Sequence, residues 1–181
     1  MSRLSFLLIS FCLIVLLNLL SCNNGLNWRT NSLINISKTA EEKIVCIDIP
    51  KEKHRKEIVR ALDVWNISLK NWIKFQPTTE LYSCDYLITE FNEEMSDMPE
   101  ALAFVPSVGS KVIYLIKGKY EFDPYGITMH EIGHTLGAQH MLGTLMNDIY
   151  DKELYKCPDS TTIAQVAAWN RIPLKNLTWC L

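Results

Sequence analysis

The feature that most constrains this chain is an eleven-residue run from His130 to His140 that reads H-E-x-x-H-x-x-G-x-x-H. On a helix, His130 and His134 lie one turn apart and point the same way, so both imidazoles can bind one zinc ion at about 2.0–2.1 Å. Gly137 predicts the helix end, because the residue after a helix often needs a positive φ that glycine adopts at little cost. The chain then turns sharply and brings back His140 as a third ligand.

Three protein ligands with an acidic neighbour indicate a catalytic zinc site rather than a structural one. Three ligands leave a fourth position open for water, whereas structural sites are closed by four protein ligands. Glu131 is placed to hold a zinc-bound water rather than the metal itself. The alternative is a helix whose histidines only pack or are solvated. The run contains three of the chain's four histidines, and this concentration favours a metal site.

The run matches the signature of the metzincin zinc peptidases, and its H-E-x-G-H-x-L-G part most resembles the matrixins, the matrix-metalloprotease-like branch. The resemblance implies an α+β, zincin-like single domain with a twisted mixed sheet of about five strands and three main helices. In this family a Met-turn follows the active-site helix, and Met146 follows His140 at a suitable spacing. An ordinary core methionine is the alternative interpretation of Met146.

By resemblance, the protein is expected to be a zinc-dependent endopeptidase that hydrolyses peptide bonds of protein substrates. Zinc would polarise the peptide carbonyl and lower the pKa of its bound water, with Glu131 as the general base. The substrate would lie extended along an edge strand at Ala101, Leu102 and Ala103, by strand addition. Tyr150 matches a tyrosine in the wall of the matrixin S1′ pocket, which implies cleavage before Leu, Ile, Met or Phe.

The chain departs from the matrixin pattern at several positions. Asp148 replaces the proline two residues past the Met-turn methionine, and Met141 replaces the serine after the third histidine, so the shape of the pocket stays open. Phe104 stands where matrixins usually carry a histidine of a structural zinc site. One catalytic zinc ion and no structural zinc are therefore expected, and the sequence carries no recognisable signal for calcium.

The first 42 residues are expected to precede the folded domain. Residues 1–21 combine a basic Arg3 with an apolar stretch, which is typical of a secretory signal peptide. The sequence L-L-S-C that ends at Cys22 resembles a bacterial lipobox, which implies cleavage before Cys22 and a lipid attached to it. A plain secreted protein and an uncleaved membrane anchor are the alternatives. Residues 22–42 are polar and predict a flexible tether, and residues 43–181 form the metzincin-like catalytic domain.

Four cysteines remain beyond the targeting segment, an even number that predicts two disulfides in an exported domain. Four cysteines allow three pairings. We favour Cys157–Cys180, which would close the last helix onto the chain end, and Cys46–Cys84, which would join the first strand to the start of the second. Four buried free thiols are the alternative.

Alternating apolar residues predict strands at 43–49, 86–91 and 111–116, and the segment 101–106 resembles the edge strand of matrixins. Apolar residues at helical spacing predict one long helix over about 51–75. The residues of this stripe are Ile58, Leu62, Trp65, Leu69, Trp72 and Ile73.

Two further helices are predicted after the strands. Asp123 is expected to cap the zinc-binding helix, because it offers an acceptor and a proline follows it. Ser160 or Thr161 is expected to cap a last helix that runs through Trp169. His54, early in the first helix, is expected to be solvated.

The charge and composition limit the classes of partner. The formal net charge is −2 and the chain has no basic run, so nucleic acid is not expected as a partner. The expected partners are a protein or peptide substrate and a membrane reached through the lipid at Cys22, with the protein a monomer. It would then be an exported lipoprotein on the cell surface or in the periplasm, or a secreted protein. The alternative function is a surface binding module that keeps the fold without proteolysis, although such a module has no need of Glu131.

Overall fold

The structure is a computed structural model that describes residues 40–70, 72–92 and 100–180. The predicted signal peptide, the lipobox Cys22 and most of the predicted tether lie outside the described residues, so the anchor stays a prediction. Among the described residues, no helix has both the length and the apolar character needed to span a bilayer.

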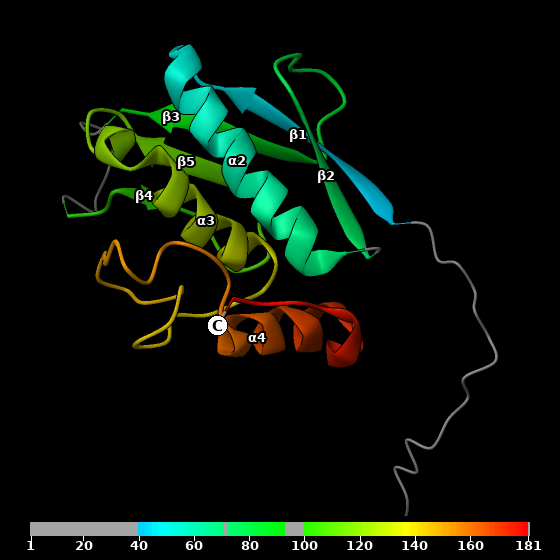
Figure 1. Cartoon of the computed structure of the whole chain (residues 1–181). Helices are drawn as coiled ribbons and strands as arrows, with labels where there is room; N and C mark the ends of the chain where they lie inside the picture. The colour runs from blue at the N-terminus through cyan, green and yellow to red at the C-terminus, as the bar shows by residue number, and fades with distance from the viewer. Residues whose placement is uncertain (1–39, 71, 93–99, 181) are drawn as a thin grey trace, which may run out of the picture. The chain divides into compact units, whose positions relative to one another are not determined.

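A five-stranded mixed sheet forms the centre of the domain (Figure 1). The strand order is β2-β1-β3-β5-β4. β4 pairs antiparallel with β5, and the other neighbouring strands pair in parallel. The strands are β1 (Glu41–Asp48), β2 (Ile73–Thr78), β3 (Tyr86–Phe91), β4 (Ala103–Phe104) and β5 (Val112–Ile116).

Three α-helices complete the described part of the domain: α2 (Glu52–Leu69), α3 (Pro124–Thr135) and α4 (Ser160–Asn170). Figure 1 shows α2 and α3 side by side on one face of the sheet and α4 below them, where Asn170 donates to the carbonyl of Leu136 at the end of α3. Trp65 of α2 joins this helix to α3, because its buried Nε1 donates a hydrogen bond of 3.1 Å to the carbonyl of Met129. The predicted α+β class, with a five-stranded mixed sheet and three helices, is confirmed.

The predicted helix over 51–75 is wrong at its end, since α2 stops at Leu69 and the next residues form β2. Buried Ile73 and Phe75 alternate with exposed Lys74, which is the period of a strand. Asn66 helps to reverse the chain, because its side chain accepts from the N–H of Phe75 at 2.7 Å and donates to its carbonyl at 3.0 Å. Parallel pairing with β1 therefore overrides the helical spacing of the apolar residues.

His54 also differs from the expectation, because it is buried rather than solvated, with 7% of its surface exposed. Its Nδ1 lies 3.3 Å from the hydroxyl of Tyr120, which donates to Glu90 at 2.6 Å. The burial arises because the 3-10 turn η2 (Tyr120–Phe122) packs on the start of α2. The helical pattern of residues 51–75 gives no sign of this distant contact.

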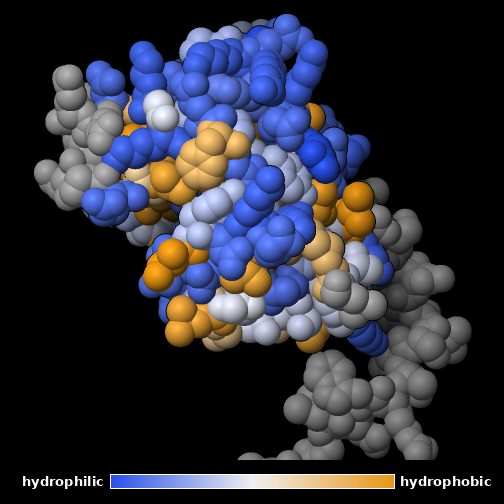
Figure 2. Space-filling model, turned by 60° about the vertical axis from the view of Figure 1, so that its left-hand side comes forward, coloured by the Kyte–Doolittle hydropathy of each residue, from blue (hydrophilic) through white to orange (hydrophobic). Residues whose placement is uncertain are grey.

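The apolar side chains that remain at the surface are spread over the molecule. Figure 2 displays one face, which is mostly hydrophilic and carries apolar side chains in several separate patches. The large apolar residues with more than half of their surface exposed are Ile67, Leu81, Tyr82, Phe122, Leu142, Ile149 and Trp169. Single exposed apolar residues of this kind are normal on a soluble domain.

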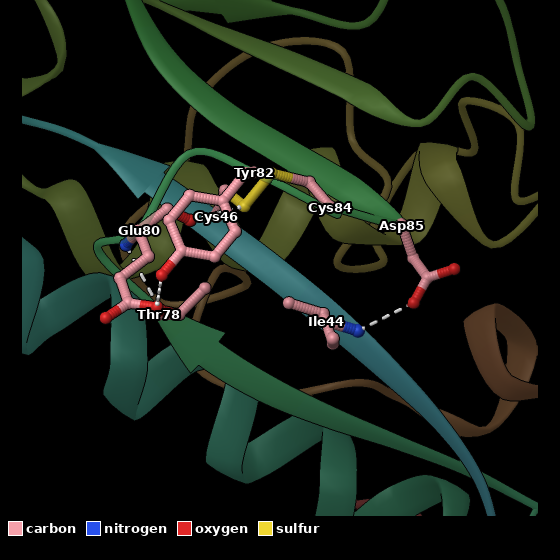
Figure 3. Close-up of a disulfide and its surroundings, with 7 residues drawn as sticks. All are labelled: Ile44, Cys46, Thr78, Glu80, Tyr82, Cys84 and Asp85. Carbon is pink, nitrogen blue, oxygen red and sulfur yellow. Dashed lines mark hydrogen bonds between the residues drawn. A yellow bond between two sulfur atoms is a disulfide. The ribbon is translucent and has the colours of Figure 1, made fainter.

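Two disulfides close the domain, and both have the pairings favoured from the sequence. Cys46 joins Cys84 with a Cα–Cα distance of 5.6 Å, and Cys157 joins Cys180 at 6.2 Å. Figure 3 shows the first of them linking β1 to the loop before β3, beside Tyr82. Disulfides persist in oxidising compartments, so these bonds indicate an exported protein.

We expect each disulfide to contribute about 2–4 kcal/mol to the free energy of unfolding, mainly by restricting the unfolded chain. Peptide mapping after alkylation of the denatured, unreduced protein should find none of these four cysteines modified. The double variant Cys157→Ser/Cys180→Ser should unfold at lower urea concentration than wild type. Alkylated peptides from all four positions would show free thiols instead.

Candidate metal centre

Helix α3 carries the first two histidines, and its start follows the sequence prediction. Asp123 is the N-cap, since its Oδ1 accepts a hydrogen bond from the backbone N–H of Gly126 at 3.0 Å, and Pro124 occupies the first turn. Met129 and Ile132 are buried in the core, which fixes the rotation of the helix. His130 and His134 therefore project together from another side of the same helix.

The three histidines of the run converge on one point. The Nε2 of His134 lies 3.1 Å from that of His130 and 3.0 Å from that of His140. Four ligands in a tetrahedron around zinc, each at about 2.0–2.1 Å, lie about 3.3 Å apart, so one ion fits between these nitrogens with little adjustment. Among the described residues, these three side chains are the one group of histidines, cysteines and acidic residues close enough to share an ion.

Backbone carbonyls set the protonation of two of these rings. The Nδ1 of His130 lies 2.8 Å from the carbonyl of Leu145, and the Nδ1 of His134 lies 2.9 Å from that of Ala138. A carbonyl can only accept, so Nδ1 carries the hydrogen and the lone pair of each Nε2 points to the shared centre. The unprotonated Nε2 atoms of His130 and His134 repel one another at 3.1 Å, and a cation between them would remove that repulsion. The residues therefore fit a bound metal ion.

Burial keeps these ligands in the neutral form that binds metals. It lowers the pKa of His130 to about 3, and the nearby His134 adds to the effect. Burial also lowers the pKa of His134 below its ordinary value. His140 is exposed to solvent and approaches from the loop after α3. The centre is thus closed by protein on the side of His130 and open to solvent on the side of His140.

Glu131 follows His130 in the chain and is buried, with 6% of its surface exposed. It does not belong to the group of side chains that converges on the metal position. Burial raises the pKa of its carboxyl to about 8 in the absence of a metal ion. A cation held nearby favours the ionised form and opposes this rise.

Two glycines allow the backbone turn and the close packing found around the three histidines. Gly137 has a φ of +96° and follows the end of α3, as predicted from its place in the run, and the turn that it makes leads to His140. Gly133 lies between the two helical ligands and faces the fully buried Met146, whose Sδ occupies the space that a Cβ would need. Met146 therefore packs directly against the metal-binding turn of α3.

Tyr150 lies at the N-terminal end of α3. Its hydroxyl donates to the Oδ2 of Asp123 at 2.6 Å, and its ring meets Phe122 edge-on at 5.1 Å. Burial is the main cause that raises its pKa above the ordinary tyrosine value, followed by the hydrogen bond to Asp123. Because Asp123 also caps α3, the loop that carries Tyr150 is tied to the helix that carries the ligands.

The predicted substrate segment is only partly a strand. Of its residues, Ala103 belongs to β4, whereas Ala101 and Leu102 precede that strand. The carbonyl of Leu102 accepts from the N–H of Ile116 at 3.0 Å, which holds this segment against β5. Farther along the chain, the N–H of Gly109 donates to the carbonyl of His134 at 2.8 Å, so the turn after β4 is joined to the metal-binding helix.

Sequence reasoning missed one ring that supports the ligands. Tyr155 stacks on His130 with ring centroids 4.8 Å apart and planes 20° apart, and its hydroxyl donates to the carbonyl of Asn147 at 2.5 Å. The loop after the run has no periodic pattern that could mark this tyrosine. Tyr155 is buried, with 5% of its surface exposed, because of tertiary packing that no local sequence pattern indicates.

No family model matches the sequence, and no match was found among curated proteins. The geometry of the three histidines and the fold that presents them therefore carry the functional argument.

Proposed function

We propose that the protein is a zinc-dependent endopeptidase of the metzincin type, most similar to the matrixins. One observation carries the proposal: three Nε2 atoms converge on one point, and the buried Glu131, which follows the first of these histidines in the chain, does not share that point. Zinc at this position would polarise a peptide carbonyl and lower the pKa of a water molecule.

The histidines and Glu131 have separate roles in the proposed reaction. His130 and His134 would hold the ion from α3, and the carbonyls of Leu145 and Ala138 keep their rings in the tautomer that binds a metal. Glu131 takes a proton from the attacking water on its carboxylate and delivers it to the leaving amine nitrogen, so one group serves as base and then as acid. Its burial keeps competing solvent away from the proton.

The substrate would lie as an extended strand along β4. In the described part of the sheet, β4 is the outermost strand next to β5, so its outer edge can accept an added strand. Tyr150 and the exposed Phe122 together offer an aromatic wall at the start of α3, which supports an apolar side chain after the scissile bond.

The test is a cleavage profile of zinc-loaded protein on a broad peptide library, read by mass spectrometry. We expect cuts before Leu, Ile, Met or Phe, loss of cleavage on addition of a zinc chelator, and recovery on addition of zinc. A protein that carries a full complement of zinc and cuts nothing in the library or in a panel of unfolded proteins would refute the peptidase and leave the binding module.

A further inference from the structure

The carboxylate of Asp159, at the start of α4, receives four hydrogen bonds. Its Oδ1 accepts from the backbone N–H groups of Thr161 at 2.8 Å and Thr162 at 3.0 Å. Its Oδ2 accepts from the backbone N–H of Leu145 at 2.8 Å and from the hydroxyl of Thr162 at 2.7 Å. Asp159, rather than the predicted Ser160 or Thr161, is therefore the N-cap of α4, and it does more than cap the helix.

Leu145 connects this carboxylate to the metal centre. Its N–H donates to Asp159 and its carbonyl accepts from the Nδ1 of His130, while its side chain is buried with 1% exposed. One residue is thus held by hydrogen bonds at both of its backbone groups. The carboxylate of Asp159 therefore holds Leu145, and the carbonyl of Leu145 orients the ring of His130.

The charge of Asp159 strengthens this connection. Burial pushes its pKa up, but the hydrogen bonds from Leu145, Thr162 and Thr161 outweigh that effect and hold the pKa below the ordinary value. Asp159 is therefore ionised at neutral pH, and a bond from an N–H to a carboxylate is stronger than one to a neutral acceptor.

We propose that Asp159 is a positioning residue of the metal centre, which holds Leu145 so that its carbonyl fixes the ring of His130. The inference rests on the metal centre of the proposed function but not on proteolysis. Groups that orient a metal ligand in this way typically change metal affinity by about 10–100-fold when they are removed. A residue that only capped α4 would change stability without changing metal affinity.

Two replacements of Asp159 separate these roles. Asp159→Ser keeps a favoured N-cap side chain, which is too short to reach Leu145 while it caps the helix. Asp159→Asn keeps one oxygen but places an NH2 group where the other accepted, so it cannot serve both Leu145 and the helix N-terminus. The matched control is Thr162→Val, which removes the hydroxyl bond to Asp159 and leaves the bond from Leu145 in place.

The experiment measures the zinc dissociation constant of folded protein by chelator competition, and the visible spectrum of the cobalt-substituted protein. Asp159→Ser and Asp159→Asn should bind zinc about 10–100-fold more weakly than wild type and alter the cobalt bands. Thr162→Val should lower stability and keep the wild-type affinity and spectrum.

Two results would overturn the inference. One is wild-type affinity and spectrum in folded Asp159→Ser, and the other is a loss of affinity in Thr162→Val equal to that in the Asp159 variants. Because the readout is metal binding, a wild type that binds zinc but cleaves no peptide would refute the peptidase alone.

Discussion

Replacement of Glu131 by alanine is expected to lower kcat by about 10²–10⁴-fold and to leave the zinc content of the protein unchanged. The loss follows from the removal of the general base, because the described residues that converge on the metal position are three histidines and include no carboxylate that could replace Glu131. The metal stays because its three ligands are untouched. Kinetics on the best library peptide and metal analysis of the purified variant give both numbers.

His140→Ala is the matched comparison, because it should lose zinc and activity together. His140 supplies one of three nitrogens and is the ligand most exposed to solvent, so its removal alters the fold little. A Glu131→Ala variant that kept full activity would show that the base lies elsewhere. A variant that lost its zinc would show that Glu131 binds the metal.

Gly137→Ala is expected to lower the free energy of unfolding by about 2–5 kcal/mol. The first part of this cost is the left-handed backbone, which disfavours a Cβ by about 1–2 kcal/mol. The second part is steric, because the new Cβ would overlap the ring of Trp169. That ring projects from α4 onto Gly137, and displacing it should cost about 1–3 kcal/mol more. Urea denaturation of the zinc-free protein measures the total.

Gly118→Ala is the control for this variant. Gly118 has a φ of +84°, close to the +96° of Gly137, but nothing lies within 4 Å of a Cβ placed there. It should therefore show the backbone cost alone, and the difference between the two variants isolates the contact with Trp169. Equal losses in the two variants would mean that Trp169 moves aside freely.

The group of three histidines could be predicted from the sequence because the pattern that marks it is local. His130 and His134 lie one turn apart on a single helix, and the turn at Gly137 depends on the positive φ of that residue. The disulfides could also be anticipated, since Cys46 lies in a predicted strand and Cys84 just before another. Within the run, sequence neighbours decide where the side chains lie, whereas the disulfides join cysteines 38 and 23 residues apart.

Other features depend on partners distant in the sequence and could not be predicted. Trp72 and Ile73 continue the apolar spacing of α2, but the chain from Ile73 onward pairs in parallel with β1 and forms β2. The Nδ1 of His130 donates to the backbone carbonyl of Leu145. Because every residue has such a carbonyl, the sequence does not show which one is the acceptor. The link through Asp159 joins the run to a helix farther along the chain, and no periodic pattern marks such a contact.

The unequal exposure of the three histidines has a consequence for how a metal ion arrives and departs. His130 is enclosed by the stacked ring of Tyr155 and the carbonyl of Leu145, whereas His140 stands in solvent on the loop that follows Gly137. An incoming ion would therefore meet the exposed His140 before it reached the enclosed His130. Release would follow the opposite order, with His140 as the last ligand to lose contact with the ion.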